Sequence, residues 1–257
     1  MDKLKLNNYP IREGIYIVSD IRNQFESVYL KLRESEKRIY SDGEVRNLPS
    51  ISDKHLHFQE WKLRSKSLER FRAYLNSYER NLNFLDIGCG NGWFCGQLSR
   101  LYHNNFYCID INLTELKQAG RVFNNGRIKF IYADIFSAEL PEKNFDLITI
   151  VAAVQYFPNL KKLIERLQAL ISERGEIHII DSPFYNSEEV DAAKKRTFEY
   201  YTSIGFPEMA NNYFHHSRED LSAFNYEVLF DPNTMLSKVK KVLMIKDSPF
   251  PWIIIRK

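Results

Sequence analysis

The sequence predicts an α/β fold with a mostly parallel sheet flanked by helices. From residue 81 onward, short apolar runs alternate with helical stretches, and this alternation is typical of βαβ units. The runs are almost continuously apolar, as expected of strands that helices cover on both faces. With 257 residues and 44% hydrophobic content, the chain is long and apolar enough for one large core. A disordered or fibrous chain is therefore excluded.

Seven strands are expected in this sheet. Five apolar runs supply its centre, at residues 82–87, 106–111, 128–132, 145–151 and 177–181. Two further strands are predicted near the end of the chain, at residues 226–230 and 252–255. The apolar run at residues 240–245 is left without an assignment.

Helices are predicted between these strands, over residues 92–102, 113–123 and 160–172. The last of them has apolar residues at i, i+3, i+4 and i+7, which is typical of a helix that packs one face on a sheet. Gly175 is expected to supply the turn into the following strand. A longer helix is predicted over residues 54–80, with Asp53 near its start as N-cap and an apolar stripe that packs on the domain.

The two ends of the chain lie outside this framework. Residues 1–53 are predicted to form a partly helical N-terminal extension, and residues 54–257 the main domain. A stretch rich in tyrosine and phenylalanine, at about 185–224, exceeds the ~15 residues of an ordinary connection. It predicts a helical lid inserted after the fifth strand.

The strongest motif is LDIGCGNGWF at residues 85–94, where a buried strand opens into a loop with Gly88, Gly90 and Gly92. Glycines tolerate the positive φ of a tight strand-to-helix turn, and without a Cβ they let a ligand approach the backbone N–H groups of the helix start. A dinucleotide fingerprint would need a third glycine where this sequence has Trp93.

The G-x-G-x-G form resembles that of class I (Rossmann-like) S-adenosylmethionine (SAM)-dependent methyltransferases. The resemblance covers residues 81–181 and includes four motifs in the family's order. It implies a Rossmann-like fold, SAM as the cofactor and an enzyme that transfers a methyl group.

The resemblance also implies which residues bind SAM. Asp110 ends the second strand, where the family has an acid that accepts hydrogen bonds from both ribose hydroxyls. Asp134 closes the third strand, where the family has an acid for the adenine amino group, with Ile135 against the ring. Capping of strand ends is the alternative interpretation of both acids. The cofactor-binding residues predicted in this way are Asp86, Gly88, Gly90, Gly92, Asp110, Ile111, Asp134, Ile135 and Ala152.

Arg64 lies on the predicted helix ahead of the first of these strands. Many members of the family lay such a helix across the cofactor. The resemblance therefore makes Arg64 a candidate partner for the carboxylate in the methionine part of SAM. A solvated polar face of the helix is the alternative interpretation.

No residue receives a catalytic role from its motif, because methyl transfer from a sulfonium mainly requires alignment of the reactants. Gln155 and Tyr156 stand where small-molecule members often have a histidine, so Tyr156 is one candidate. Asp181 follows the fifth strand, and His215 and His216 lie in the predicted lid. Histidine suits base chemistry near neutral pH. Strand-end capping or packing is the alternative for each of these residues.

The leading hypothesis is a SAM-dependent methyltransferase with a small-molecule acceptor, and the aromatic lid favours an apolar or planar acceptor. An RNA or protein methyltransferase and a non-catalytic SAM-binding protein are the alternatives. DSPFY at residues 181–185 resembles the D-P-P-Y motif of nucleic-acid amino-methyltransferases, but it follows the fifth strand instead of the fourth. Residues 1–80 carry only 16 Lys and Arg against 12 Asp and Glu, so a nucleic-acid partner is not expected.

Composition indicates a cytoplasmic protein that does not enter a membrane. No run approaches the ~18 apolar residues of a membrane span, and the first residues lack the apolar stretch of a signal peptide. Cys89, Cys95 and Cys108 are odd in number and have no C-x-x-C spacing. They are expected to be small buried thiols, without a disulfide framework or a metal site.

Overall fold

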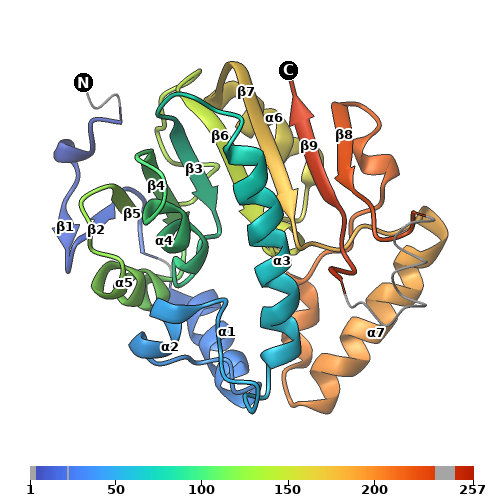
Figure 1. The fold of residues 1–257 in the computed structure, drawn as a ribbon. Helices are drawn as coiled ribbons and strands as arrows, with labels where there is room; N and C mark the ends of the chain where they lie inside the picture. The colour runs from blue at the N-terminus through green and yellow to red at the C-terminus, as the bar shows by residue number, and fades with distance from the viewer. Residues whose placement is uncertain (1–3, 22, 235–246) are drawn as a thin grey trace.

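Nine strands form a single sheet in the part of the chain that the computed structural model describes, residues 4–21, 23–234 and 247–257 (Figure 1). They are β1 (Ile11–Arg12), β2 (Ile15–Ile17), β3 (Asn83–Ile87), β4 (Asn105–Asp110), β5 (Ile128–Tyr132), β6 (Phe145–Val151), β7 (Ile171–Ile180), β8 (Asn225–Phe230) and β9 (Trp252–Arg256). The order across the sheet is β1-β2-β5-β4-β3-β6-β7-β9-β8. Strands β2 to β7 pair in parallel, whereas β1, β8 and β9 run antiparallel to their neighbours. The predicted α/β class is confirmed.

The prediction of seven strands is wrong by two, because the N-terminal extension contributes β1 and β2. These strands form a hairpin whose turn residues, Glu13 and Gly14, have φ of 50° and 81°. Positive φ at both central positions is the requirement of a type I′ turn, whose twist matches that of the strands. Strands of two and three residues are too short to show an alternating pattern, so the sequence gives no periodic signal for them.

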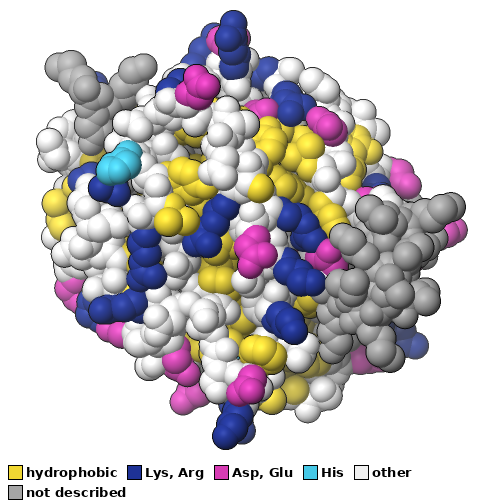
Figure 2. All heavy atoms as spheres, viewed as in Figure 1, with side chains coloured by type: hydrophobic (Ala, Val, Ile, Leu, Met, Phe, Trp, Pro, Cys, Tyr) yellow, Lys and Arg dark blue, Asp and Glu magenta, His cyan; other side chains and the backbone are white. Residues whose placement is uncertain are grey.

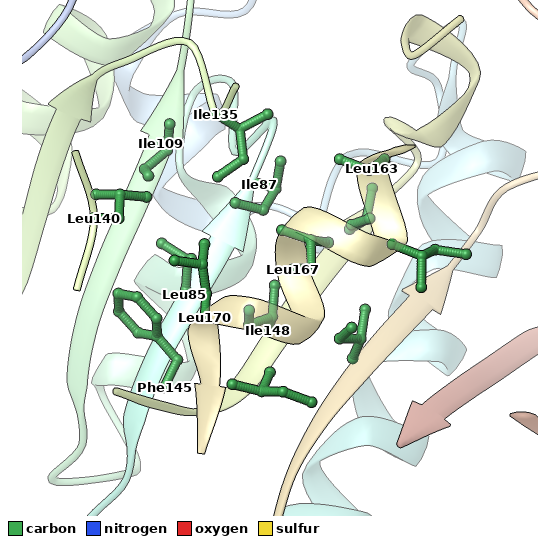
Figure 3. Packing of buried hydrophobic residues seen from close by; sticks show 14 of the residues in the cluster. Leu85, Ile87, Ile109, Ile135, Leu140, Phe145, Ile148, Leu163, Leu167 and Leu170 are labelled. Carbon is green, nitrogen blue, oxygen red and sulfur yellow. The ribbon is translucent and has the colours of Figure 1, made fainter. Parts of the chain in front are cut away.

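Helices cover both faces of the sheet. They are α1 (Asn23–Ser35), α2 (Asp42–Asn47), α3 (Phe58–Leu75), α4 (Trp93–Ser99), α5 (Leu113–Val122), α6 (Leu160–Leu170) and α7 (Val190–Ser203). One buried cluster joins α3, α4 and α5 to one face of the sheet. The other joins α6 to the opposite face, where Leu163 and Leu167 pack with Leu85 and Ile148 (Figure 3). Burying each such leucine contributes about 1.5–3 kcal/mol.

The connection between α6 and β7 differs from the prediction. The helix ends at Leu170, and β7 begins at Ile171 without an intervening turn. Gly175 therefore lies inside the strand. A Cβ on Gly175 would lie 2.8 Å from the carbonyl oxygen of Phe145, and the β6/β7 register shifts between Phe145 and Leu147. The glycine permits a close backbone approach at an irregularity of the ladder.

Helix α3 is shorter than predicted at both ends. Its N-cap is His57, and Asp53 does not cap it. The preceding residues form turns instead, since His55 N–H donates to the Ser52 carbonyl and Phe58 N–H to the His55 carbonyl. The predicted apolar stripe is confirmed, because Trp61, Leu68, Phe71 and Leu75 are all buried.

The predicted lid is helical. It holds α7 and three short 3-10 helices, at Ser187–Glu189, Pro207–Asn212 and Glu219–Leu221. Leu32 of α1 packs in one buried cluster with Tyr201 and Met209 of the lid. Both α1 and α7 lie beyond the carboxyl ends of the parallel strands (Figure 1).

Three other predictions concern the rest of the chain. All three cysteines are buried and free, as expected. Within the described residues, none of the helices has the length and apolar character needed to cross a membrane. The run at residues 240–245 lies outside the described residues.

Candidate functional site

Two adjoining cavities lie at the carboxyl ends of the central strands. Ligands of open α/β sheets bind where neighbouring strands are reached by connections in opposite directions. Strand β3 is at such a point, because its neighbours are β4 and β6. A cavity of about 260 Å³ adjoins one of about 770 Å³ there. The residues that line both are Tyr29, Gly88, Gly90, Glu115, Ala152 and Tyr156.

The smaller cavity brings together seven of the predicted cofactor-binding residues: Gly88, Gly90 and Ala152, which also line the larger cavity, and Asp110, Ile111, Asp134 and Ile135. Asp110 Oδ2 accepts a 2.7 Å hydrogen bond from Gly90 N–H, and its Oδ1 accepts one of 2.8 Å from Asn112 N–H. Burial raises the pKa of Asp110, and these backbone bonds oppose the rise. Each carboxylate oxygen has a second lone pair, so Asp110 is held in place and still able to accept hydrogen bonds from a ligand.

The glycines of the loop serve different purposes. All three have positive φ, 69° at Gly88, 52° at Gly90 and 71° at Gly92. A Cβ on Gly92 would lie 2.7 Å from the Phe130 ring, and Gly92 lines neither cavity. Gly90 lines both cavities, and a Cβ there would lie 3.2 Å from Glu115 Oε2. Gly92 therefore permits packing, whereas Gly90 keeps the junction of the cavities open.

Asp86 lines the larger cavity, but its hydrogen bonds lie within the protein. Its Oδ1 accepts a 2.6 Å bond from the Thr149 hydroxyl, and its Oδ2 accepts a 3.4 Å bond from the Cys95 thiol. Burial raises the pKa of Asp86 to about 7 against these two bonds. These contacts fix the strand end that precedes the glycine loop.

The larger cavity is enclosed by the N-terminal extension and the lid. Tyr29 and Arg33 of α1 form part of its wall, and Arg196 and Tyr200 of α7 form another part. Its charged residues are Arg33, Glu36, Arg38, Glu60, Arg64, Asp86, Glu115, Asp181 and Arg196. Glu60 is paired with both Arg38 and Arg64. Most of these charges are therefore balanced within the wall.

Arg64 lines the larger cavity and not the smaller one. It is bound to its own helix, since its Nε and Nη2 lie 3.2 and 2.9 Å from Glu60 Oε1. Its guanidinium also lies 5.1 Å from the centroid of the Trp61 ring. Any carboxylate that binds Arg64 has to share it with Glu60.

Two of the catalytic candidates, Tyr156 and Asp181, line the larger cavity. Tyr156 lies where both cavities meet, and Gln155 precedes it. Asp181 follows β7 with a φ of 53° and is buried. Its Oδ1 accepts hydrogen bonds from the hydroxyls of Ser67, at 2.6 Å, and Ser248, at 3.2 Å.

The two lid histidines line neither cavity. His216 is buried, and its Nε2 lies 3.2 Å from the Val154 carbonyl oxygen. The Nε2 atom of His215 lies 2.8 Å from the Thr197 hydroxyl. Burial lowers the pKa of both rings. His215 therefore joins two parts of the lid, whereas His216 joins the lid to the segment that follows β6.

Several cavity residues are absent from the sequence predictions, and Tyr29, Arg33 and Glu115 are among them. Burial raises the pKa of Glu115 to about 7, and Arg33 opposes the rise. The apolar residues of α1, at positions 25, 28, 29 and 32, follow the i, i+3, i+4, i+7 pattern, which was the available signal for this helix. No local signal shows that the helix reaches the glycine loop.

In comparisons with known proteins, this chain is similar to methyltransferases. A family model described as a methyltransferase domain matches residues 78–243. An uncharacterised methyltransferase of Mycobacterium tuberculosis is 31% identical over 96 residues, 37% of this chain and 48% of its own. The phosphoethanolamine N-methyltransferase of Plasmodium falciparum is 33% identical over 129 residues, 48% of each chain. The match thus spans about half the length of these curated relatives.

Solved structures share the fold at lower identity. Phosphoethanolamine N-methyltransferase 2 of Haemonchus contortus, solved with phosphomonomethylethanolamine and S-adenosylhomocysteine, has a TM-score of 0.56 at 15% identity, over 90% of this chain and 59% of its own. Geranyl diphosphate C-methyltransferase of Streptomyces coelicolor has a TM-score of 0.55 at 11% identity, over 79% of this chain and 84% of its own. The family model covers more than half of the sequence. The chain therefore belongs to the methyltransferase-domain family, with the Rossmann-like fold of class I.

Proposed function

We propose that this chain is a SAM-dependent methyltransferase with a small-molecule acceptor. The observation that carries the proposal is the pair of adjoining cavities, one lined by Asp110 and Asp134 and the other enclosed by α1 and α7. The smaller cavity suits an adenosine, because it combines two acids with the apolar side chain of Ile135. The open junction at Gly90 suits the rest of the cofactor.

The chain's own residues act by binding and orientation. When bound, SAM supplies a methyl carbon that a positively charged sulfur has already activated. Asp110 and Asp134 would hold its adenosine part, and Gly88 and Gly90 would let it lie against the backbone. Walls from α1 and α7 would exclude water and align the acceptor, and alignment of this kind is worth ~7–11 kcal/mol of barrier.

Several features support a small acceptor over RNA or protein. Residues 1–53 and the lid at about 185–224 both contribute to the wall of the larger cavity, so we propose that they cover the acceptor. Tyr200, Tyr201 and Tyr213 line it, in keeping with an aromatic contact to the acceptor. Basic and acidic side chains are interspersed on the face shown in Figure 2, unlike the basic stripe of a nucleic-acid site. Two of the relatives are named for small acceptors, phosphoethanolamine and geranyl diphosphate.

A transfer assay tests this function. The protein is incubated with SAM and, separately, with phosphoethanolamine, glycine, phenethylamine, total RNA or an unfolded peptide pool, and methylated products are measured by mass spectrometry. Methylation in the small-molecule set alone is the expected result. Methylation of RNA or peptide alone would contradict the proposal.

A further inference from the structure

Two residues that line the larger cavity each carry a buried hydrogen-bond acceptor that has no donor among the described residues. These acceptors are Oδ2 of Asp181 and Oε1 of Gln155. Each of these residues is only 8% exposed. A buried polar atom without a partner costs about 1–3 kcal/mol, and more when it is charged. Both atoms therefore favour a ligand that brings donors to them.

The orientation of each group is fixed. Gln155 Nε2 donates a 2.7 Å hydrogen bond to the Ala152 carbonyl oxygen. A carbonyl only accepts, so the amide nitrogen faces it and Oε1 points elsewhere. In Asp181, the hydroxyls of Ser67 and Ser248 both bind Oδ1, which leaves Oδ2 as the unpartnered oxygen.

The residues that carry these two acceptors follow neighbouring strands, β6 and β7, at the carboxyl end of the parallel sheet. Val151 pairs with Ile180 in the β6/β7 register, and Ala152 N–H donates to the Ile180 carbonyl. The backbone of Asp181 therefore lies about one strand spacing, ~4.8 Å, from the backbone of Ala152. Ala152 lines both cavities, so this pair lies beside the point where the cavities meet.

We propose that the acceptor is an amine, bound through its N–H groups by Asp181 Oδ2 and Gln155 Oε1. An amine or ammonium carries enough donors for both atoms, whereas an alcohol has a single hydrogen and satisfies one of them. A positive charge on nitrogen would also act in the same direction as Arg64 and Arg70, whose charges oppose the effect of burial on the Asp181 carboxyl. The inference rests on the proposed function, since it assigns the acceptor of that same site.

The reaction balances with this assignment. A bound ammonium first gives one proton to the Asp181 carboxylate, which frees the nitrogen lone pair. That lone pair forms the N–C bond as the C–S bond breaks, the electron pair of the C–S bond stays on sulfur, and the methylated nitrogen carries the positive charge. Burial raises the pKa of Asp181, which makes the carboxylate a better proton acceptor.

Calorimetry with matched ligands tests the proposal. Each amine is titrated beside its hydroxyl counterpart into protein saturated with S-adenosylhomocysteine: phosphoethanolamine with ethylene glycol monophosphate, and phenethylamine with 2-phenylethanol. In at least one pair the amine is expected to bind tenfold or more tightly than the alcohol. Asp181→Asn and Gln155→Leu should each weaken amine binding at least tenfold and leave S-adenosylhomocysteine affinity within twofold. Asp191→Asn, an exposed position on α7, is the control and should change neither.

The other outcomes are decisive as well. Equal binding of amine and alcohol in both pairs, or unchanged amine binding in Asp181→Asn, would overturn the amine assignment while S-adenosylhomocysteine still binds. A loss of S-adenosylhomocysteine affinity in Asp181→Asn would overturn it too, because Asp181 would then contact the cofactor. Failure of the wild-type protein to bind S-adenosylhomocysteine would instead refute the proposed function.

Discussion

Tyr200 of α7 donates a 2.6 Å hydrogen bond to Glu36 Oε1, just past the end of α1. This bond joins the lid to the N-terminal extension across the larger cavity, which both residues line. Next to it, Tyr201 and Leu32 pack in a shared apolar cluster. The wall of the cavity is therefore closed by contacts between segments that lie about 160 residues apart.

Removing this bond should loosen the lid without unfolding the protein. Tyr200 is half exposed, so Tyr200→Phe should cost less than about 1 kcal/mol of global stability. Hydrogen exchange in α7 should become faster, because the bond restrains the helix, and mass spectrometry resolves this by segment. Tyr226→Phe, on exposed strand β8, is the control. Equal exchange rates in α7 of the wild type and Tyr200→Phe would contradict a latching role.

Gly90 offers a test that separates backbone strain from cofactor binding. Gly90 and Gly126 both have positive φ, but a Cβ on Gly126 would meet no atom within 4 Å. Alanine at either position should cost about 1 kcal/mol of stability through the backbone. Only Gly90→Ala should also weaken S-adenosylhomocysteine binding, by tenfold or more in calorimetry, because its methyl group fills the junction of the cavities. Equal affinities of the two variants would refute this role of Gly90.

Glu176 predicts how stability depends on pH. Burial alone would raise its pKa, but the His178 ring, whose Nε2 lies 3.4 Å from Glu176 Oε2, and the hydrogen bonds from Tyr74 and Tyr78 outweigh burial and lower the pKa from 4.5 to about 2. A carboxyl group whose pKa is lower in the folded protein than in the unfolded chain stabilises the fold above pH 4.5. This stabilisation is lost as the pH falls toward 2. Glu176→Gln should thus destabilise by on the order of 2–3 kcal/mol at pH 7 and progressively less down to pH 3.

Urea unfolding of wild type and Glu176→Gln at several pH values measures this difference. Glu199→Gln, which changes an exposed side chain of α7, provides the comparison and should show no such trend. A gap between wild type and Glu176→Gln that stays constant from pH 7 to pH 3 would show that Glu176 is not held ionised by its neighbours.

The packing of α6 on the sheet predicts that two leucine-to-alanine substitutions, one buried and one exposed, differ in their effect on the free energy of unfolding. Leu167 is completely buried, whereas Leu101 is 58% exposed. Leu167→Ala should lower the free energy of unfolding by about 2–5 kcal/mol, because it leaves a cavity against the sheet. Leu101→Ala should change it by less than about 0.5 kcal/mol. Chemical denaturation of both variants decides whether α6 is packed as described.

The sequence predicts the central sheet well because its signals are local. Strands β5 and β6 have the predicted bounds, since each is a continuous apolar run between polar turns. The glycine loop is likewise found from its spacing along the chain, and Asp110 from the family resemblance at the end of the next strand. Errors occur where long-range packing decides the structure. Gly175 looks like a turn residue, but the close approach of Phe145 makes it part of a strand.

The residues of the larger cavity could be predicted only in part. Asp181 and Tyr156, which line it, are predicted from their positions after strand ends, where ligands bind in such sheets. Arg33 and Glu115 were not found, because their place in the cavity depends on how α1 docks on the glycine loop. The wall around an acceptor is made of segments distant in sequence, and no periodicity records their contact.

The central claim is that this chain binds SAM at the junction of the two cavities, and isothermal titration with S-adenosylhomocysteine tests it most directly. The account predicts one site per chain, competition by SAM, and at least tenfold weaker binding in Asp110→Ala, because Asp110 lines the smaller cavity with oxygens that accept hydrogen bonds. Absence of binding to either ligand by the folded wild-type protein would contradict the account.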